Sequence, residues 1–244
     1  MKRLAIAGIL VFWVLAFPSF AIDGTELLKT IDANLNPESF EMYRKLINVE
    51  PNGREKEFIL YSVKKGKDKI ASVFLSPASE KGRATLRVGE NMWLFIPNVG
   101  KPIRITSLQS ITGGIFNNAD IMRLNYTQEY NCEKVEKVEG LYLLHLKAKT
   151  RSVAYDKVRM WADDQKLLPT KIECYAASGI LLKTLYFKEI KAFGDKIVRP
   201  SVIETDSPLH KGYKSIMIFA RVKAMKINDE VFTLAFMSNL ESLR

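Results

Sequence analysis

The sequence contains only two histidines and two cysteines among 244 residues, and it has few groups suited to catalysis. His145 stands in an apolar stretch and His210 in a loop rich in Pro and Gly, and neither has a neighbour at metal-ligand spacing. The pair Asp163-Asp164 is interpreted as a turn. The chain has no G-x-S-x-G, H-E-x-x-H or phosphate-loop motif. These absences argue against an enzyme and predict no metal and no cofactor.

The two cysteines, Cys132 and Cys174, could form a disulfide in an oxidising compartment. If the chain between them forms a meander, they lie three strands apart, which is roughly 14 Å at the usual spacing of strands. A disulfide requires a much shorter separation. We therefore predict two small, inert and mostly buried thiols, and Cys174 has no activating partner near it in the sequence.

Long hydrophobic runs are absent except at the start of the chain. Lys2 and Arg3 precede an apolar run over residues 4–17, and Pro18-Ser19-Phe20-Ala21 offers a cleavage site. This pattern predicts a signal peptide over residues 1–21 and a periplasmic mature protein over residues 22–244. A retained N-terminal anchor is the alternative. No linker or internal repeat divides the rest, so we expect a single domain.

Positive charge is in excess: 37 Lys and Arg stand against 27 Asp and Glu, a net charge of +10. Such an excess favours anionic surfaces such as phospholipid head groups. The basic residues are scattered and no nucleic-acid motif is present, so nucleic acid is not an expected partner. The densest cluster is interpreted as a solvated hairpin tip, with a membrane-docking patch as the alternative: Lys64, Lys65, Lys67 and Lys69.

Residues 23–35 have the pattern of a helix. Asp23 can cap it, Glu26 follows at capping-box spacing, and an apolar stripe runs through Leu27, Leu28, Ile31 and Leu35. After it, alternation with period two and tight turns predict short antiparallel strands. The candidate strands are 40–50, 56–63, 69–75, 83–88, 92–96, 102–106, 132–138, 141–149, 155–162, 168–177, 180–191, 196–204 and 213–227.

So many strands joined by short turns predict a mainly β protein with a few helices. The sheet must curl into a barrel or part of one, because a flat sheet of this width is uncommon. Residues 228–243 fit a short helix or a terminal strand about equally well.

The hairpin around Gly89-Glu90 allows a register to be predicted. A two-residue loop pairs Leu86 with Trp93 and Ala84 with Phe95, and cross-strand partners share a face. We expect Leu86, Trp93 and Phe95 on the concave side of the curled sheet, where they would contact a hydrophobic ligand. The alternative is that they are ordinary core residues.

The segment 107–131 fits no strand pattern and is too apolar for a plain loop. Gly113-Gly114 could act as a hinge, because glycine adopts conformations closed to other residues. With Leu27, Leu28 and Ile31 of the first helix, the segment predicts a mobile lid made of Gly113, Gly114, Ile115, Phe116, Ile121, Met122 and Leu124. A static cap is the alternative.

An ordered set of motifs resembles the LolA-like family of outer-membrane lipoprotein-sorting proteins over roughly residues 24–237. The set comprises residues 92–97, Arg104-Ile105, Gly113-Gly114-x-Phe116 with Asp120, residues 168–173, Ser178-Gly179, Lys183-Thr184 and Val231-Phe232-Thr233. The resemblance implies an incomplete antiparallel β-barrel with a helical lid over a hydrophobic cavity.

One departure concerns an arginine that the family's carrier uses to hold its lid, just before a proline at a strand end. The matching position, before Pro77, is Ser76. Arg83 and Arg87 are the nearby candidates to replace it.

The resemblance also implies a function. We expect a monomeric periplasmic protein that binds acyl chains of lipoproteins or phospholipids, and that sorts them towards the outer membrane or serves a dedicated transporter. Its implied partners are an inner-membrane transporter and an outer-membrane acceptor. The alternative is a non-catalytic half-barrel that acts as a sensor or accessory subunit and binds a membrane protein.

Overall fold

The computed structural model of the protein describes residues 23–194 and 197–244. The predicted signal peptide, residues 1–21, lies outside the described residues and stays a prediction. Within the described part, no helix has both the length and the apolar character needed to cross a membrane.

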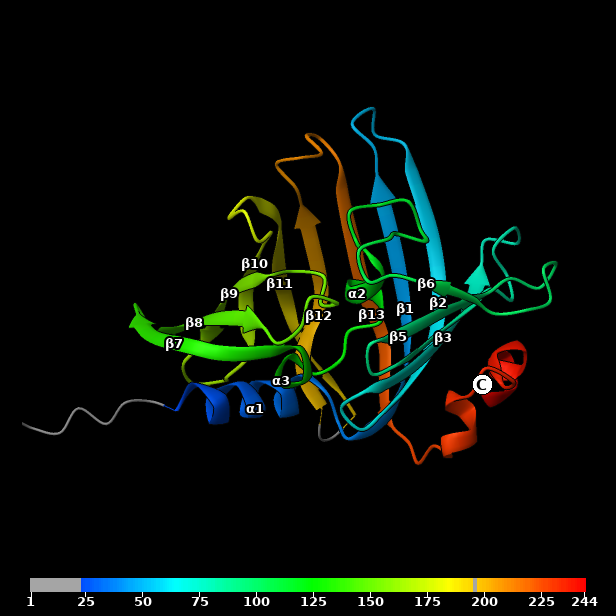
Figure 1. The fold of residues 1–244 in the computed structure, drawn as a ribbon, viewed down its shortest axis with the longest axis horizontal. Helices are drawn as coiled ribbons and strands as arrows, with labels where there is room; N and C mark the ends of the chain where they lie inside the picture. Colours follow the sequence, from blue (N-terminus) through cyan, green and yellow to red (C-terminus); the bar gives the residue numbers. More distant parts are fainter. Residues whose placement is uncertain (1–22, 195–196) are drawn as a thin grey trace, which may run out of the picture.

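Thirteen strands form one antiparallel sheet that curls without closing, in the order β6-β5-β4-β3-β2-β1-β13-β12-β11-β10-β9-β8-β7 (Figure 1). The predicted incomplete barrel is confirmed. All thirteen predicted strands are present, with ends shifted by a few residues: β1 (Ser39–Val49), β2 (Glu55–Lys65), β3 (Lys69–Ser76), β4 (Ala84–Val88), β5 (Asn91–Phe95), β6 (Ile103–Ile105), β7 (Tyr130–Val138), β8 (Leu141–Ala148), β9 (Lys157–Asp163), β10 (Pro169–Tyr175), β11 (Leu181–Phe193), β12 (Ile197–Asp206) and β13 (Lys214–Ala224).

The chain builds this sheet from its centre outwards and then from the far edge inwards. Strands β1 to β6 follow one another to one edge, the chain crosses to the opposite edge, and β7 to β13 lead back to the centre. The last strand, β13, pairs with β1 along almost its whole length, from Phe40 opposite Ala224 to Val49 opposite Lys214. The segment that crosses from β6 to β7 therefore has to run over a face of the sheet.

The predicted N-terminal helix is α1 (Gly24–Leu35). Asp23 caps it by accepting hydrogen bonds from the backbone N–H groups of Thr25 and Glu26. The expected reciprocal half of a capping box is replaced by an ion pair between Glu26 and Lys29. The predicted stripe of Leu27, Leu28, Ile31 and Leu35 is buried. The helix lies against β7 and β12, at the mouth of the curled sheet (Figure 1).

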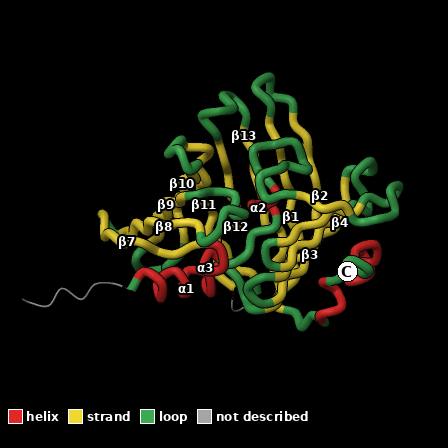
Figure 2. Tube along the Cα trace, viewed as in Figure 1, coloured by secondary structure: helices red, strands yellow, loops and turns green. Residues whose placement is uncertain are grey.

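The crossing segment fills the concave side of the sheet. We call residues 107–125 the flap; it contains the short helix α2 (Asn118–Ile121) and leads into α3 (Tyr126–Glu129). Figure 2 shows it as loops and short helices in front of the central strands. Phe116, Ile121 and Met122 are almost fully buried and belong to one hydrophobic cluster with α1 and the concave face.

A second hydrophobic cluster lies on the outer face of β3 and β4. Two 3₁₀ helices near the C-terminus, η1 (Asp229–Phe232) and η2 (Met237–Leu243), cover it, and they resolve the ambiguity of residues 228–243. In Figure 1 this C-terminal segment lies outside the curve of the sheet. The cluster contains Tyr61, Val63, Ala71, Val73, Ala84, Leu86, Ile227, Val231, Phe232, Met237 and Leu240.

This second cluster corrects the predicted location of Leu86, Trp93 and Phe95. The predicted register is confirmed, since Leu86 pairs with Trp93 and Ala84 with Phe95. However, Leu86 belongs to the outer cluster, and Trp93 and Phe95 pack against it. The alternation identified residues that share a face but not which face is concave, because both faces of β4 are buried.

Candidate functional site

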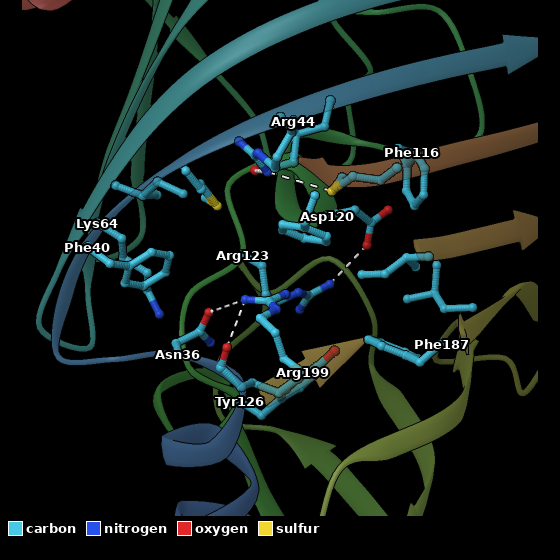
Figure 3. A pocket seen from close by; sticks show the side chains of 18 residues that line it. Asn36, Phe40, Arg44, Lys64, Phe116, Asp120, Arg123, Tyr126, Phe187 and Arg199 are labelled. Atoms are coloured by element: carbon cyan, nitrogen blue, oxygen red, sulfur yellow. Dashed lines mark hydrogen bonds and ion pairs between the residues drawn. The ribbon is translucent and has the colours of Figure 1, made fainter. Parts of the chain in front are cut away.

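A mostly apolar pocket lies between the flap, the end of α1 and the concave face of the sheet (Figure 3). Phe116 and Ile121 of the flap form one wall. The opposite walls come from central strands, with Phe40 and Met42 on β1 and Phe219 on β13. The remaining apolar lining consists of Leu35, Ile70, Leu185, Phe187, Ile203 and Met217.

The pocket beneath the flap is small. It measures about 60 Å³. A buried water needs on the order of 10–15 Å³ on the same kind of measure, so the pocket has room for a few waters. Sites for drug-sized ligands usually occupy roughly 300 Å³ or more. A long acyl chain could enter only if the flap or α1 moved away from the sheet.

Asp120 is the main polar anchor of the flap. Its carboxylate accepts hydrogen bonds from Tyr155 Oη at 2.9 Å, Lys183 Nζ at 2.8 Å and Arg123 Nη2 at 2.9 Å. It also completes a capping box with Asn117 at the start of α2. Burial alone raises the pKa of Asp120, but the charges of Lys183 and Arg123 outweigh burial and hold this pKa below its usual value. The carboxylate is therefore ionised near neutral pH in this arrangement.

Arginines on the sheet hold the backbone of the flap. Arg44 on β1 donates to the carbonyl of Ile121 at 2.7 Å, and Arg87 on β4 donates to the carbonyl of Met122 at 3.2 Å. Arg83 donates to the carbonyl of Ile111 at 3.2 Å. Among the described residues, Ser76 makes no such hydrogen bond to the flap. The two arginines proposed from the sequence to replace the family's arginine, Arg83 and Arg87, both bind the flap backbone.

Gly114 allows the flap to approach β1 closely. A Cβ atom there would lie 1.9 Å from Oδ1 of Asn48. Asn48 is fixed, because its Nδ2 donates to the carbonyl of Thr112 at 3.0 Å and its Oδ1 accepts from Ser215 Oγ at 2.8 Å. Gly113 has a φ of 75°, in the region that favours glycine. The predicted hinge stays a prediction, and close approach is the visible reason for Gly114.

The structure brings most of the predicted lid residues to one place. All of the following are buried in the cluster that joins α1, the flap and the concave face: Leu27, Leu28, Ile31, Phe116, Ile121, Met122 and Leu124. Ile115 is buried beside them, and its backbone N–H donates to Ser215 Oγ at 2.9 Å. Leu86, Trp93 and Phe95 are not among the residues that line the pocket.

Besides Arg123, which is paired with Asp120, three further cations line the pocket wall, and they were not predicted there from the sequence: Arg44, Lys64 and Arg199. Lys64 corrects the predicted solvated hairpin tip, since it is 1% exposed. Lys65 and Lys69 of the same hairpin instead form ion pairs with Asp229 at 3.0 and 2.7 Å. The period-two pattern of the strands could have predicted the burial of Arg44 and Lys64.

Arg44 and Lys64 occupy positions on the apolar face of their strands. Arg44 follows Phe40 and Met42 at even spacing on β1, and Lys64 follows Phe58 and Leu60 at even spacing on β2. Residues at even spacing on a strand share a face. Each charged residue thus continues an apolar face.

Burial shifts the acid–base properties of these three cations. It lowers the pKa of Arg44 to about 9, and the positive charge of Arg199 lowers that pKa further. Burial also lowers the pKa of Lys64 to about 8, although the negative charge of Asp32 opposes this shift. Burial lowers the pKa of Arg199 itself to about 10. The pocket is therefore an apolar site with an unusually positive wall.

The predicted separation of the two cysteines is confirmed, and the predicted burial holds for Cys174 but only in part for Cys132. Both are free, Cys132 half-buried on β7 and Cys174 buried on β10, three strands away. Burial raises the pKa of Cys174 to about 12, so its reactive thiolate is not populated near neutral pH. Across residues 23–194 and 197–244, no three His, Cys, Asp or Glu side chains gather in a way that could hold a metal ion.

Comparisons with known proteins place the chain in a family. A family model described only as an uncharacterized protein matches residues 66–239, well over half of the chain. A search of curated proteins found no match.

Solved structures share the fold over most of the chain. A LolA superfamily protein from Nitrosomonas europaea is 29% identical with a TM-score of 0.80, and the match covers 88% of this chain and 100% of that one. A protein from Vibrio parahaemolyticus described as an outer membrane lipoprotein-sorting protein domain is 21% identical with a TM-score of 0.74, covering 88% and 98%. A DUF1329 family protein from Desulfovibrio piger is 20% identical with a TM-score of 0.76, covering 88% and 97%.

Proposed function

The chain belongs to the LolA-like family, and from this premise we propose that it is a carrier that binds acyl chains of lipoproteins or phospholipids between the flap and the concave face. The observation that carries the proposal is the mostly apolar pocket beneath the flap. The Vibrio parahaemolyticus protein described as a lipoprotein-sorting domain shares the fold in which this pocket is formed.

Binding would require the site to open, admit an acyl chain and close again. The flap and α1 move away from the sheet, an acyl chain packs against the apolar wall around Phe40 and Phe219, and the flap closes over it. Each buried methylene contributes about 0.8 kcal/mol, so ten of them contribute about 8 kcal/mol towards offsetting the cost of opening. Release then requires a receiver with a more favourable apolar site. No catalytic step and no cofactor takes part.

The cellular setting follows from the same proposal. Residues 1–21 direct export, and residues 22–244 act as a single-domain, monomeric periplasmic protein. An inner-membrane transporter would load or unload it, and an outer-membrane acceptor would receive its cargo.

The proposal is tested by native mass spectrometry of the mature protein purified without detergent, with organic extraction and binding of a neutral hydrophobic fluorophore. We expect a co-purifying lipid or acylated peptide, or saturable binding of the probe. Ile203→Trp places a larger side chain in the pocket wall and is expected to weaken probe binding at least tenfold.

The matched control is Ile59→Trp, because Ile59 is 42% exposed and lies outside the pocket. It should bind like the wild type. An empty wild-type protein that also ignores the added probe would contradict the proposal.

A second candidate function is favoured by the small volume of the closed pocket, about 60 Å³. In this alternative the flap stays closed, and the half-barrel is a sensor or accessory subunit that binds a membrane protein. A protein that purifies empty, ignores the probe and retains a membrane-protein partner in both the wild type and Ile203→Trp would support this alternative.

A further inference from the structure

The pocket wall carries three buried cations with no carboxylate partner among the described residues. Arg44 is on β1, Lys64 on β2 and Arg199 on β12, with 3%, 1% and 5% of their surfaces exposed. Figure 3 shows all three around the same space, beside apolar side chains such as Phe40 and Phe187. Unpaired buried charges are costly, so their gathering in one pocket needs a physical reason.

The carboxylates of this region are already engaged elsewhere. Glu129 pairs with Arg87 at 2.5 Å, and Asp120 pairs with Arg123 and Lys183. Asp32 on α1 accepts hydrogen bonds from the backbone N–H groups of residues 126 and 127 and from the Thr127 hydroxyl. Glu129 and Asp120 are therefore paired with other cations. Asp32 keeps its charge, which acts on Lys64 and offsets part of the effect of burial, but among the described residues it forms no ion pair with Arg44, Lys64 or Arg199.

Among the described residues, the hydrogen-bond and ring partners of the three cations are neutral groups. Arg44 donates to the Ile121 carbonyl and to Ser62 Oγ, and its Nε is buried with no partner among the described residues. Arg199 donates to the Leu35 carbonyl and lies over the Phe219 ring, with its guanidinium carbon 4.1 Å from the ring centroid. Lys64 donates to Asn125 Oδ1, which uses one of its three N–H groups. Donor capacity and positive charge therefore remain for an anion.

We propose that the pocket takes an amphiphile with an acyl chain and an anionic oxygen head group, a carboxylate or a phosphate, with the head group between Arg44, Lys64 and Arg199. The chain would lie along the apolar wall. This inference rests on the proposed function, because the amphiphile still has to enter beneath the flap. A neutral lipid would contact the apolar wall but would leave the three cations without an anionic partner. The pocket should therefore prefer amphiphiles with an anionic head group over neutral ones.

The test compares acidic and neutral amphiphiles of equal chain length by displacement of a neutral hydrophobic fluorophore from the wild-type protein. The pairs are palmitate against hexadecanol, and lysophosphatidate against monoacylglycerol. We expect the acidic member of each pair to bind at least tenfold more tightly, the usual size of a charge-assisted hydrogen bond. Inorganic phosphate alone should compete weakly, because it lacks the chain.

Lys64→Met keeps the apolar stem and removes the charge, so it should weaken the binding of acidic amphiphiles more than that of neutral ones and so reduce the preference for the acidic member of each pair. Lys67→Met is the matched control, because Lys67 lies on the same hairpin and is exposed.

Each result decides something different. Equal binding of acidic and neutral amphiphiles by the wild type overturns the head-group site and leaves the proposed carrier function standing. Binding of inorganic phosphate as tight as that of lysophosphatidate also overturns it, since the site would then recognise the free ion. Failure of every amphiphile to bind contradicts the proposed function itself.

Discussion

Deleting residues 227–244 is expected to leave a chain that cannot fold into a soluble monomer. The deleted segment contributes Val231, Phe232, Met237 and Leu240, all at most 6% exposed, to the outer cluster. Burying each of these side chains contributes about 1.5–3 kcal/mol, or about 6–12 kcal/mol together. That range matches the roughly 5–15 kcal/mol by which a whole domain is stable. Circular dichroism and size-exclusion chromatography should report loss of cooperative unfolding and aggregation.

A single substitution in the same segment should destabilise the protein less than the deletion. Phe232→Ala is expected to lower the free energy of unfolding by about 3–5 kcal/mol, because it leaves a cavity beneath η1. Leu234→Ala is the matched control: Leu234 is 44% exposed and its loss should change stability by less than about 0.5 kcal/mol. A truncated chain that unfolds with wild-type stability would show that the outer cluster does not need its cover.

The outer cluster also bears on function. The chain itself covers Leu86, and Trp93 and Phe95 pack against the same outer cluster, on the face opposite the proposed site. Phe232→Ala should therefore bind acyl chains with unchanged affinity under conditions where it is folded. Weakened binding would implicate the outer face in the site.

Asp120→Asn is expected to release the flap and to lower the free energy of unfolding by about 3–5 kcal/mol, measured by urea denaturation. The substitution leaves Lys183 and Arg123 buried or half-buried with less counter-charge. Glu57→Gln is the control, since Glu57 makes an exposed ion pair with Lys45 and should show no measurable change. The double variant Asp120→Asn/Lys183→Met should recover part of the loss, and no recovery would contradict the pairing.

The same carboxylate predicts how stability depends on pH. The pKa of Asp120 is lower in the folded protein than its ordinary value of 3.8, so its contribution is fully present above about pH 4 to 5. The contribution is lost as the pH falls through the lowered pKa. Asp120→Asn should flatten this acid limb of the stability profile, whereas an unchanged limb would assign it to other carboxylates.

The strand pattern and the hairpin register could be read from the sequence because period-two alternation and turn residues are local properties. The location of Leu86 and Trp93 could not, because both faces of β4 are covered and alternation does not say by what. Lys64 was misread because its neighbours Lys65 and Lys67 suggest a solvated tip, while its own burial depends on the distant flap. In both cases, the burial of the residue depends on contacts between segments far apart in the chain, which local sequence patterns do not contain.

The most direct test of a carrier that holds acyl chains beneath its flap is crosslinking with a photoreactive fatty acid, followed by peptide mapping. The proposed site places the label on peptides that contain Phe40, Phe116 or Met217, which line the pocket. Ile203→Trp should remove that labelling. Label found instead on peptides containing Trp93 or Phe232, in the outer cluster, would contradict the account.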